Sequence, residues 1–167
     1  FRTAIKFDPK FARVYFELGD VLYQQHEKLE EAIANFSKSI DLDPSNDLAF
    51  RFRSWANFNL GNHKQSKEDC QLLINRDAIY QETFEQIGIN QYELGEFKNA
   101  IKSLSVNLEL AIEFEDEEEE LDLTFLYRGK AKKALEDIKG ACQDWTKSSE
   151  LGNDDAEDLL KQHCQSI

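Results

Sequence analysis

The chain has 167 residues, of which 41% are hydrophobic and 32% are charged, enough for a sizeable core beneath a solvated surface. Its formal net charge is -13, and it has no cluster of Lys and Arg that could neutralise phosphates or anionic lipid headgroups. No apolar stretch approaches the roughly 20 residues of a membrane span, so we expect neither nucleic acid nor a membrane as a partner.

The expected elements are all helices, because apolar residues recur with helical spacing and only 2 prolines and 7 glycines interrupt the chain. Residues 1–9 resemble the end of a truncated repeat, since Phe1 and Pro9 have the same spacing as Phe36 and Pro44. In chain order we then expect helices at 11–24, 28–42, 46–60, 63–75, 79–94, 97–114, 121–135, 138–150 and 153–165.

These helices pair into hairpins that repeat along the chain. Small residues in the middle of each first helix follow one another at 35, 34 and 41 residues: Gly19, Ser54, Gly88 and Gly129. A second small residue opens each second helix, and a larger one follows four positions later: Ala32 with Phe36, Ser66 with Cys70, Ala100 with Leu104, and Ala141 with Trp145. Because one hairpin cannot bury its apolar stripe alone, we expect the hairpins to stack.

Turn residues support these boundaries. Gly61 and Gly95 lie between the two helices of the second and third hairpins, where glycine ends a helix in the left-handed conformation. Asn153 is a good N-cap for a last helix with Ala156 and Leu160 on one side, which we expect to cover the final hairpin.

The pattern resembles the tetratricopeptide repeat family, and the segment 140–152 with the helix after it is similar to the closing repeat of bacterial members. The resemblance implies an all-α fold, a right-handed superhelical solenoid of helix-turn-helix hairpins with a C-terminal capping helix. The expected divisions of this single solenoid are 11–44, 46–78, 80–112 and 122–152 for the repeats, 113–121 for an acidic insertion, and 153–167 for the capping helix.

The acidic insertion contains the run from Glu113 to Glu120. Such a run is most often a solvated extension of a helix. Docking of a basic partner is the second interpretation. A calcium site is the least favoured, because the run lacks the spaced oxygens and the glycine turn of a calcium loop.

The resemblance also implies a binding groove on the concave side of the solenoid, built from first-helix residues. Aromatic and arginine side chains at such places are the types most often energetic at interfaces, although aromatics at helical spacing are more often core. The predicted groove residues are Arg13, Phe16, Asp20, Tyr23, Arg51, Trp55, Phe58, Asn59, Glu85, Ile89, Tyr92, Lys130 and Lys133. In family members that grip a C-terminal carboxylate, Lys and Asn stand where this chain has Phe16 and Asp20, so a clamp of that type is not expected.

The sequence shows no pattern for catalysis, a cofactor or a metal: it lacks a GxxxxGK[ST] loop, a GxGxxG turn and an HExxH helix. His26 and His63 fall in or near hairpin turns, and the adjacent His163 and Cys164 point about 100° apart on a helix. Three cysteines without CxxC spacing favour a reducing, cytoplasmic compartment. Cys142 and Cys164 could meet where the last helix folds back, with packing as the favoured interpretation.

We therefore expect a non-catalytic scaffold or adaptor that binds a peptide or protein segment in its groove. Two alternatives remain open at this stage. One is a structural module that self-associates through its N-terminal end, and the other is an accessory domain of a larger enzyme.

Overall fold

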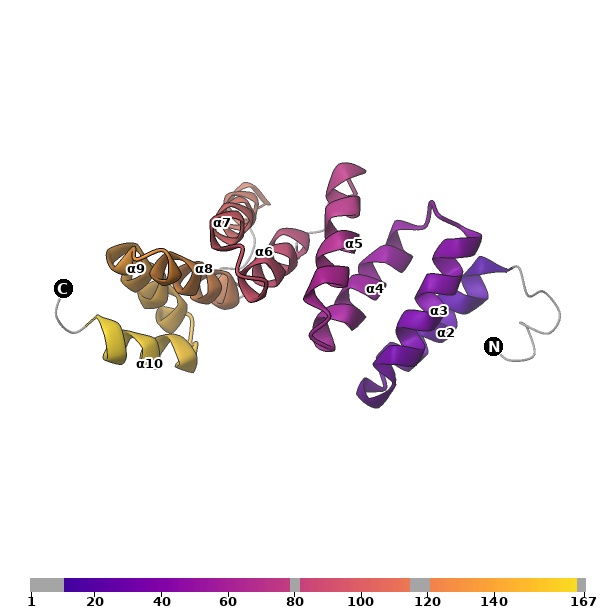
Figure 1. Ribbon diagram of the computed structural model, residues 1–167, viewed down its shortest axis with the longest axis horizontal. Helices are drawn as coiled ribbons and strands as arrows, with labels where there is room; N and C mark the ends of the chain where they lie inside the picture. The colour runs from indigo at the N-terminus through magenta and orange to yellow at the C-terminus, as the bar shows by residue number, and fades with distance from the viewer. Residues whose placement is uncertain (1–10, 79–81, 115–120, 165–167) are drawn as a thin grey trace. The chain divides into compact units, whose positions relative to one another are not determined.

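The computed structural model describes residues 11–78, 82–114 and 121–164, and these ranges contain helices and turns but no strand (Figure 1). Contacts divide the chain into two compact units, Phe1–Ile79 and Tyr80–Ile167, and each is described by itself. Within the described ranges, no helix is both long enough and apolar enough to cross a membrane.

Unit 1 consists of two helix hairpins. The first pairs α2 (Ala12–Tyr23) with α3 (Leu29–Leu42) through a short 3-10 turn at His26–Lys28, and the second pairs α4 (Asp47–Asn59) with α5 (His63–Asn75). Each helix packs against the next one in the chain. Phe36 and Ala32 are fully buried at the centre of the first hairpin.

Unit 2 repeats this arrangement and adds a last helix. Its hairpins are α6 (Thr83–Glu93) with α7 (Phe97–Phe114), and α8 (Asp122–Ala134) with α9 (Ile138–Glu150). The capping helix α10 (Asp154–His163) packs on α9, as Figure 1 shows. Its Ala156 is fully buried with Leu126 and Trp145 in one apolar cluster, so the expected cap is confirmed.

The small residue of each hairpin lets its two helices approach closely, as the repeat pattern predicts. A Cβ on Gly19 would lie 2.7 Å from the Phe36 ring, and one on Gly88 would lie 2.6 Å from Leu104. The second hairpin has Ser54 at this place and tolerates its Cβ because the facing residue is the smaller Cys70. The predicted pairing of small with large residues is therefore confirmed.

The turns between paired helices also agree with the sequence. Gly61 and Gly95 have φ angles of 74° and 75°, in the left-handed region that glycine favours. In the fourth hairpin Glu136 takes the same conformation with φ 68°, although the sequence gives no glycine there. The geometry of this turn thus requires a left-handed backbone conformation even at a residue that ordinarily disfavours it.

Apart from the start of α6, the helix ends lie within two residues of their predicted places wherever the structure describes them. The main difference is α6, which begins at Thr83 rather than 79; residues 79–81 lie outside the described ranges. In the acidic insertion α7 continues to Phe114, and residues 115–120 are likewise outside. Residues 1–9, the predicted tail of a truncated repeat, also lie outside the described ranges.

Asn153 caps α10 as predicted. Its side-chain oxygen accepts a hydrogen bond from the Ala156 amide at 3.1 Å, and its Nδ2 donates to Asp122 Oδ2 at 2.7 Å. We expect Asn153→Ala to lower the free energy of unfolding by about 1–2 kcal/mol, because both bonds are lost. Urea denaturation measures this, with Asn99→Ala on the exposed first turn of α7 as the control. Equal effects of the two substitutions would contradict the capping role.

Cys142 and Cys164 form a disulfide, with their Cα atoms 5.9 Å apart. This corrects the expectation that the two residues only pack together. The chain turns back after α9, so that the end of α10 comes beside the start of α9 and the two sulfurs meet. The third cysteine, Cys70, is a thiol outside the disulfide and is fully buried, and burial raises its pKa to about 12.

Candidate protein-binding site

The first helices of unit 1, α2 and α4, bring a set of aromatic side chains together. The Trp55 ring is 5.3 Å from the Phe52 ring and stacks on Tyr23 at 6.5 Å, while the Arg51 guanidinium lies 4.4 Å from the Trp55 centroid. Asn59 Nδ2 donates to the Tyr23 hydroxyl at 3.1 Å. We name these five residues the Trp55 face; Asn59 is exposed and the other four are partly exposed.

Unit 2 has a corresponding arrangement on α6 and α8. The Tyr92 and Tyr127 rings meet edge to face at 5.4 Å, and the Lys130 ammonium lies 4.6 Å from the Tyr127 centroid. Burial and the nearby Glu93 raise the pKa of both tyrosines, so both hydroxyls remain protonated donors at neutral pH. We name Tyr92, Tyr127 and Lys130 the Tyr127 face.

The two faces are equivalent in sequence position. Tyr23 and Tyr92 each come four residues after the small residue of their hairpin, while Phe52 and Tyr127 each come two before it in the next hairpin. Sequence analysis missed Phe52 and Tyr127 as site residues. The signal that could have found them is this shared position, which is aromatic in the second hairpin of each unit.

The other predicted residues of unit 1 lie in several environments. Arg13 is exposed and pairs with Glu17 at 3.3 Å. Phe16 packs against the rings of Phe36 and Phe52, in the core cluster of the first hairpin. Phe58 contacts the His63 ring at 5.9 Å, beside the turn of its own hairpin, and Asp20 is partly exposed.

In unit 2, two of the predicted residues are engaged inside the structure. Ile89 is only 4% exposed, so its side chain is not a surface feature. Glu85 accepts a hydrogen bond from the Thr124 hydroxyl, which in turn accepts one from Asn107 Nδ2 at 3.1 Å. Lys133 Nζ lies 2.8 Å from His163 Nε2 and so connects α8 to the capping helix.

In each unit, the first helix of the second hairpin is bound to its neighbours by an arginine–aspartate ion pair. Sequence analysis did not predict this pair. Arg53 donates Nε and Nη2 to the two oxygens of Asp69 at 2.9 and 2.7 Å, and Nη1 to Ser37 Oγ at 3.0 Å. This bonding to Asp69 raises the pKa of the Arg53 guanidinium. The bridge joins three successive helices, α3, α4 and α5.

In unit 2 Arg128 makes the same three bonds. Its Nε and Nη2 donate to Asp144 at 2.9 and 2.6 Å, and its Nη1 donates to Ser105 Oγ at 3.2 Å. Lys132 adds a second cation to Asp144 at 2.7 Å. The two bridges hold α4 and α8, the helices that carry Trp55 and Tyr127, in fixed rotation about their axes.

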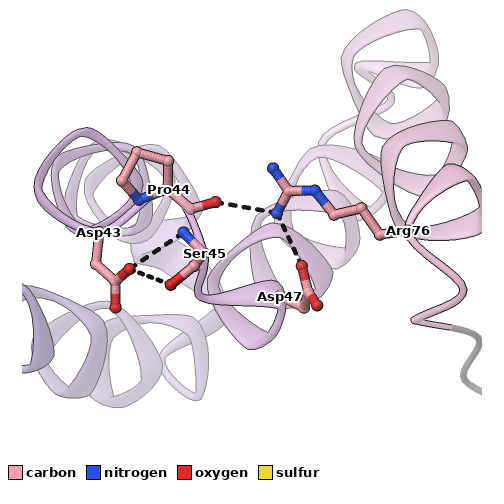
Figure 2. Close-up of a pocket in the computed structure, with 5 residues that line it drawn as sticks. All are labelled: Asp43, Pro44, Ser45, Asp47 and Arg76. Atoms are coloured by element: carbon pink, nitrogen blue, oxygen red, sulfur yellow. Dashed lines mark hydrogen bonds and ion pairs between the residues drawn. The ribbon is translucent and has the colours of Figure 1, made fainter.

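A pocket of about 560 Å³ lies at the turn between α3 and α4, and Figure 2 shows that its polar groups bond to each other. Arg76 Nη1 donates to the Pro44 carbonyl at 3.0 Å and to Asp47 at 2.9 Å. Asp43 accepts bonds from the hydroxyl and amide of Ser45, which lower the pKa of its carboxyl. These groups hold a turn together and do not form a reactive centre.

A family model described as a tetratricopeptide repeat matches residues 12–46, the first hairpin. The crystal structure of MamA superposes with a TM-score of 0.75 over 93% of this chain and 86% of that one, at 19% identity. The first hairpin therefore matches the tetratricopeptide repeat family, and the chain as a whole has the tetratricopeptide repeat fold. A second similar structure is that of PilF from Pseudomonas aeruginosa, with a TM-score of 0.70 over 90% of this chain and 68% of the other, at 19% identity.

One further similar structure and one sequence relative have names that mention binding or association. YrrB, titled a tetratricopeptide repeat protein with an unusual peptide-binding site, has a TM-score of 0.59 and 18% identity over 96% of this chain and 97% of its own. RNA polymerase II-associated protein 3 of mouse is 30% identical over 106 residues, which are 64% of this chain and 16% of that protein. The chain therefore spans less than a fifth of that relative's length. The tetratricopeptide repeat fold is a protein-interaction module, so a protein partner is the function class that these comparisons support.

Proposed function

We propose that this tetratricopeptide repeat chain is a non-catalytic adaptor that binds a peptide or protein segment on the Trp55 face. The observation that carries the proposal is the Arg51–Trp55–Tyr23 stack, which leaves large aromatic surface and a cation partly exposed on the first helices of unit 1. Trp, Tyr and Arg contribute the largest energies at protein interfaces. The rigid stack also loses little side-chain entropy when a ligand binds.

The chemistry of the face suggests the kind of segment that it binds. The aromatic rings favour an apolar or aromatic side chain, while Arg51 favours a carboxylate next to it. Asp20, partly exposed on α2, favours a basic residue further along the segment. The ligand that we propose is therefore a segment of mixed charge around an apolar anchor. The Tyr127 face, which includes the cation Lys130 and has Glu93 close by, combines aromatic rings with both charges in the same way.

A non-catalytic role is part of this proposal. Among the described residues, no group of three or more His, Cys, Asp and Glu side chains is placed to hold a metal. Asp69 and Asp144, the buried carboxylates of the Arg53 and Arg128 bridges, are each engaged by a cation.

A cytoplasmic location stays a prediction. The Cys142–Cys164 disulfide favours an oxidising compartment over the reducing cytoplasm. Self-association through residues 1–9 concerns a segment outside the described ranges.

The test uses peptides selected against the wild-type chain from a random-sequence display library, with binding then measured by fluorescence anisotropy. We expect Arg51→Ala to weaken the selected peptide about tenfold and Trp55→Ala about a hundredfold, since truncated interface hot spots cost about 1.4–3 kcal/mol. Lys38→Ala, which removes one exposed positive charge from α3, is the matched control and should bind as the wild type does.

Because Trp55 packs against Phe52 and Tyr23, its loss could also disturb unit 1. Circular dichroism and the melting temperature of each variant separate this effect from a loss of contact. Arg51→Ala removes a partly exposed side chain, so it serves as the variant that keeps its fold. If folded Arg51→Ala and Trp55→Ala both bind the selected peptides as tightly as Lys38→Ala does, the Trp55 face is not the binding site.

A further inference from the structure

A cavity of about 550 Å³ in unit 2 exposes the Cys142–Cys164 disulfide. Both cysteines line it, together with Lys139 and Lys161. Cys142 is 9% exposed, while Cys164, at the C-terminal end of α10, is more accessible. Cys164 is therefore the cysteine of the pair that is more exposed to solvent.

The charges around the cavity suit thiol chemistry. Lys139 stands three residues before Cys142 on α9. Lys161, on α10, stands three residues before Cys164, the C-cap of that helix. Lys161 is partly neutralised by Glu157 at 2.8 Å and Asp158 at 3.5 Å. Lys139 is therefore the cation that we assign to a thiolate formed at Cys142, because a nearby positive charge favours the thiolate over the thiol.

The disulfide also fixes one end of the capping helix. At its N-terminal end α10 is held by Asn153, which bonds to Asp122 and caps the helix. Its C-terminal end is held by the disulfide and by the contact of His163 with Lys133 and the Trp145 ring. A helix of ten residues is not stable in isolation. Its last turns are attached to α9 by the covalent bond together with the packing of Leu159 and Leu160 on the Trp145 cluster.

We propose that Cys142–Cys164 is a thiol–disulfide exchange site for a small dithiol, and that its reduction releases the C-terminal half of α10 from α9. One thiolate of the dithiol attacks Cys164 Sγ and forms a mixed disulfide. The bond to Cys142 breaks, and its electron pair leaves on Cys142 Sγ as a thiolate beside Lys139. The second thiol of the reagent then attacks the mixed disulfide. The products are the oxidised, cyclic reagent and two protein thiols.

Cys70 provides an internal reference for this chemistry. It is fully buried in unit 1, and its thiol has a pKa raised to about 12, so it reacts neither as an exchange partner nor with an alkylating reagent while the unit is folded. The native chain should therefore react at two cysteines after reduction, and at none before it.

The experiment treats the folded chain with dithiothreitol, alkylates it with iodoacetamide and locates the labels by mass spectrometry. We expect no label without the reductant, and labels on Cys142 and Cys164 but not on Cys70 with it. Hydrogen exchange of the α10 amides should accelerate by about a hundredfold on reduction, because the cross-link no longer opposes local opening. The amides of α4 and α5 should not change.

The Cys142→Ser/Cys164→Ser variant separates release of the helix from a general effect of the reductant. Its α10 amides should exchange as fast as those of the reduced wild type, and dithiothreitol should not change them further. Labels on Cys142 and Cys164 without reductant would overturn the proposal, as would labelling that requires urea. Equal protection of α10 in the oxidised and reduced chains would overturn the release of the helix.

Discussion

Asp144→Ala is expected to lower the free energy of unfolding of unit 2 by about 3 kcal/mol, because it leaves two desolvated cations without their shared carboxylate. Arg128 gives Asp144 two hydrogen bonds and Lys132 adds a third contact, while the Asp144 side chain is only 5% exposed. Urea denaturation followed by Trp145 fluorescence measures the loss. A Trp55→Phe background removes the other tryptophan, so that the signal comes from unit 2 alone.

Two comparisons give this prediction its controls. Glu150→Ala breaks an exposed pair with Lys147 on the same helix, where the side chains are 57% and 63% exposed, and should cost no more than about 0.5 kcal/mol. The triple variant Arg128→Met/Lys132→Met/Asp144→Leu should lie within about 1 kcal/mol of the wild type, because it removes all three charges of the bridge together. An effect of Asp144→Ala no greater than that of Glu150→Ala would show that the bridge does not stabilise unit 2.

Gly129→Ala is expected to destabilise unit 2 by about 2 kcal/mol, although the same change in an exposed helix stabilises it by up to about 1 kcal/mol. The new Cβ would lie 2.5 Å from Trp145 Nε1 and 3.2 Å from the carbonyl oxygen of Ala141. The Trp145 ring is fully buried and donates a hydrogen bond to the Leu126 carbonyl at 3.3 Å, so it cannot move aside without breaking that bond.

Ser54→Ala is the matched control, since the same position in the second hairpin already carries a Cβ. Its cost should stay near 1 kcal/mol, the worth of the lost bond from its hydroxyl to the Arg51 carbonyl. In a Trp145→Leu background the penalty of Gly129→Ala should shrink, which a double-mutant cycle measures. A penalty that is unchanged there would locate the strain in the backbone of α8 rather than in the indole contact.

Much of the fold could be predicted from the sequence, because helical periodicity and the spacing of small residues record local and neighbouring contacts. Gly19 predicts the close approach of Phe36, and Gly61 predicts a left-handed turn. The cap at Asn153 follows from the residue type alone. Each of these features depends on residues that are close in the chain or that lie in adjacent helices.

The remaining features depend on pairings that no local pattern identifies. Arg53 and Asp69 lie 16 residues apart among many other charges, and a charged residue on a helix is ordinarily solvated. Cys142 and Cys164 are separated by 22 residues, a spacing that is equally compatible with two free thiols. Phe52 was missed because an aromatic residue at helical spacing is more often core. Its exposure depends on how Tyr23 and Trp55 pack beside it.

The Arg53 and Arg128 bridges have a consequence for how this chain could have lengthened. Each bridge takes its serine from an odd-numbered hairpin and its arginine and aspartate from the following even-numbered one. Duplicating the second hairpin alone would place the copied Arg53 next to Gln71, which stands where the first hairpin has Ser37, whereas duplicating a pair would copy the whole bridge. The unit in which the bridge repeats along this chain is thus a pair of hairpins.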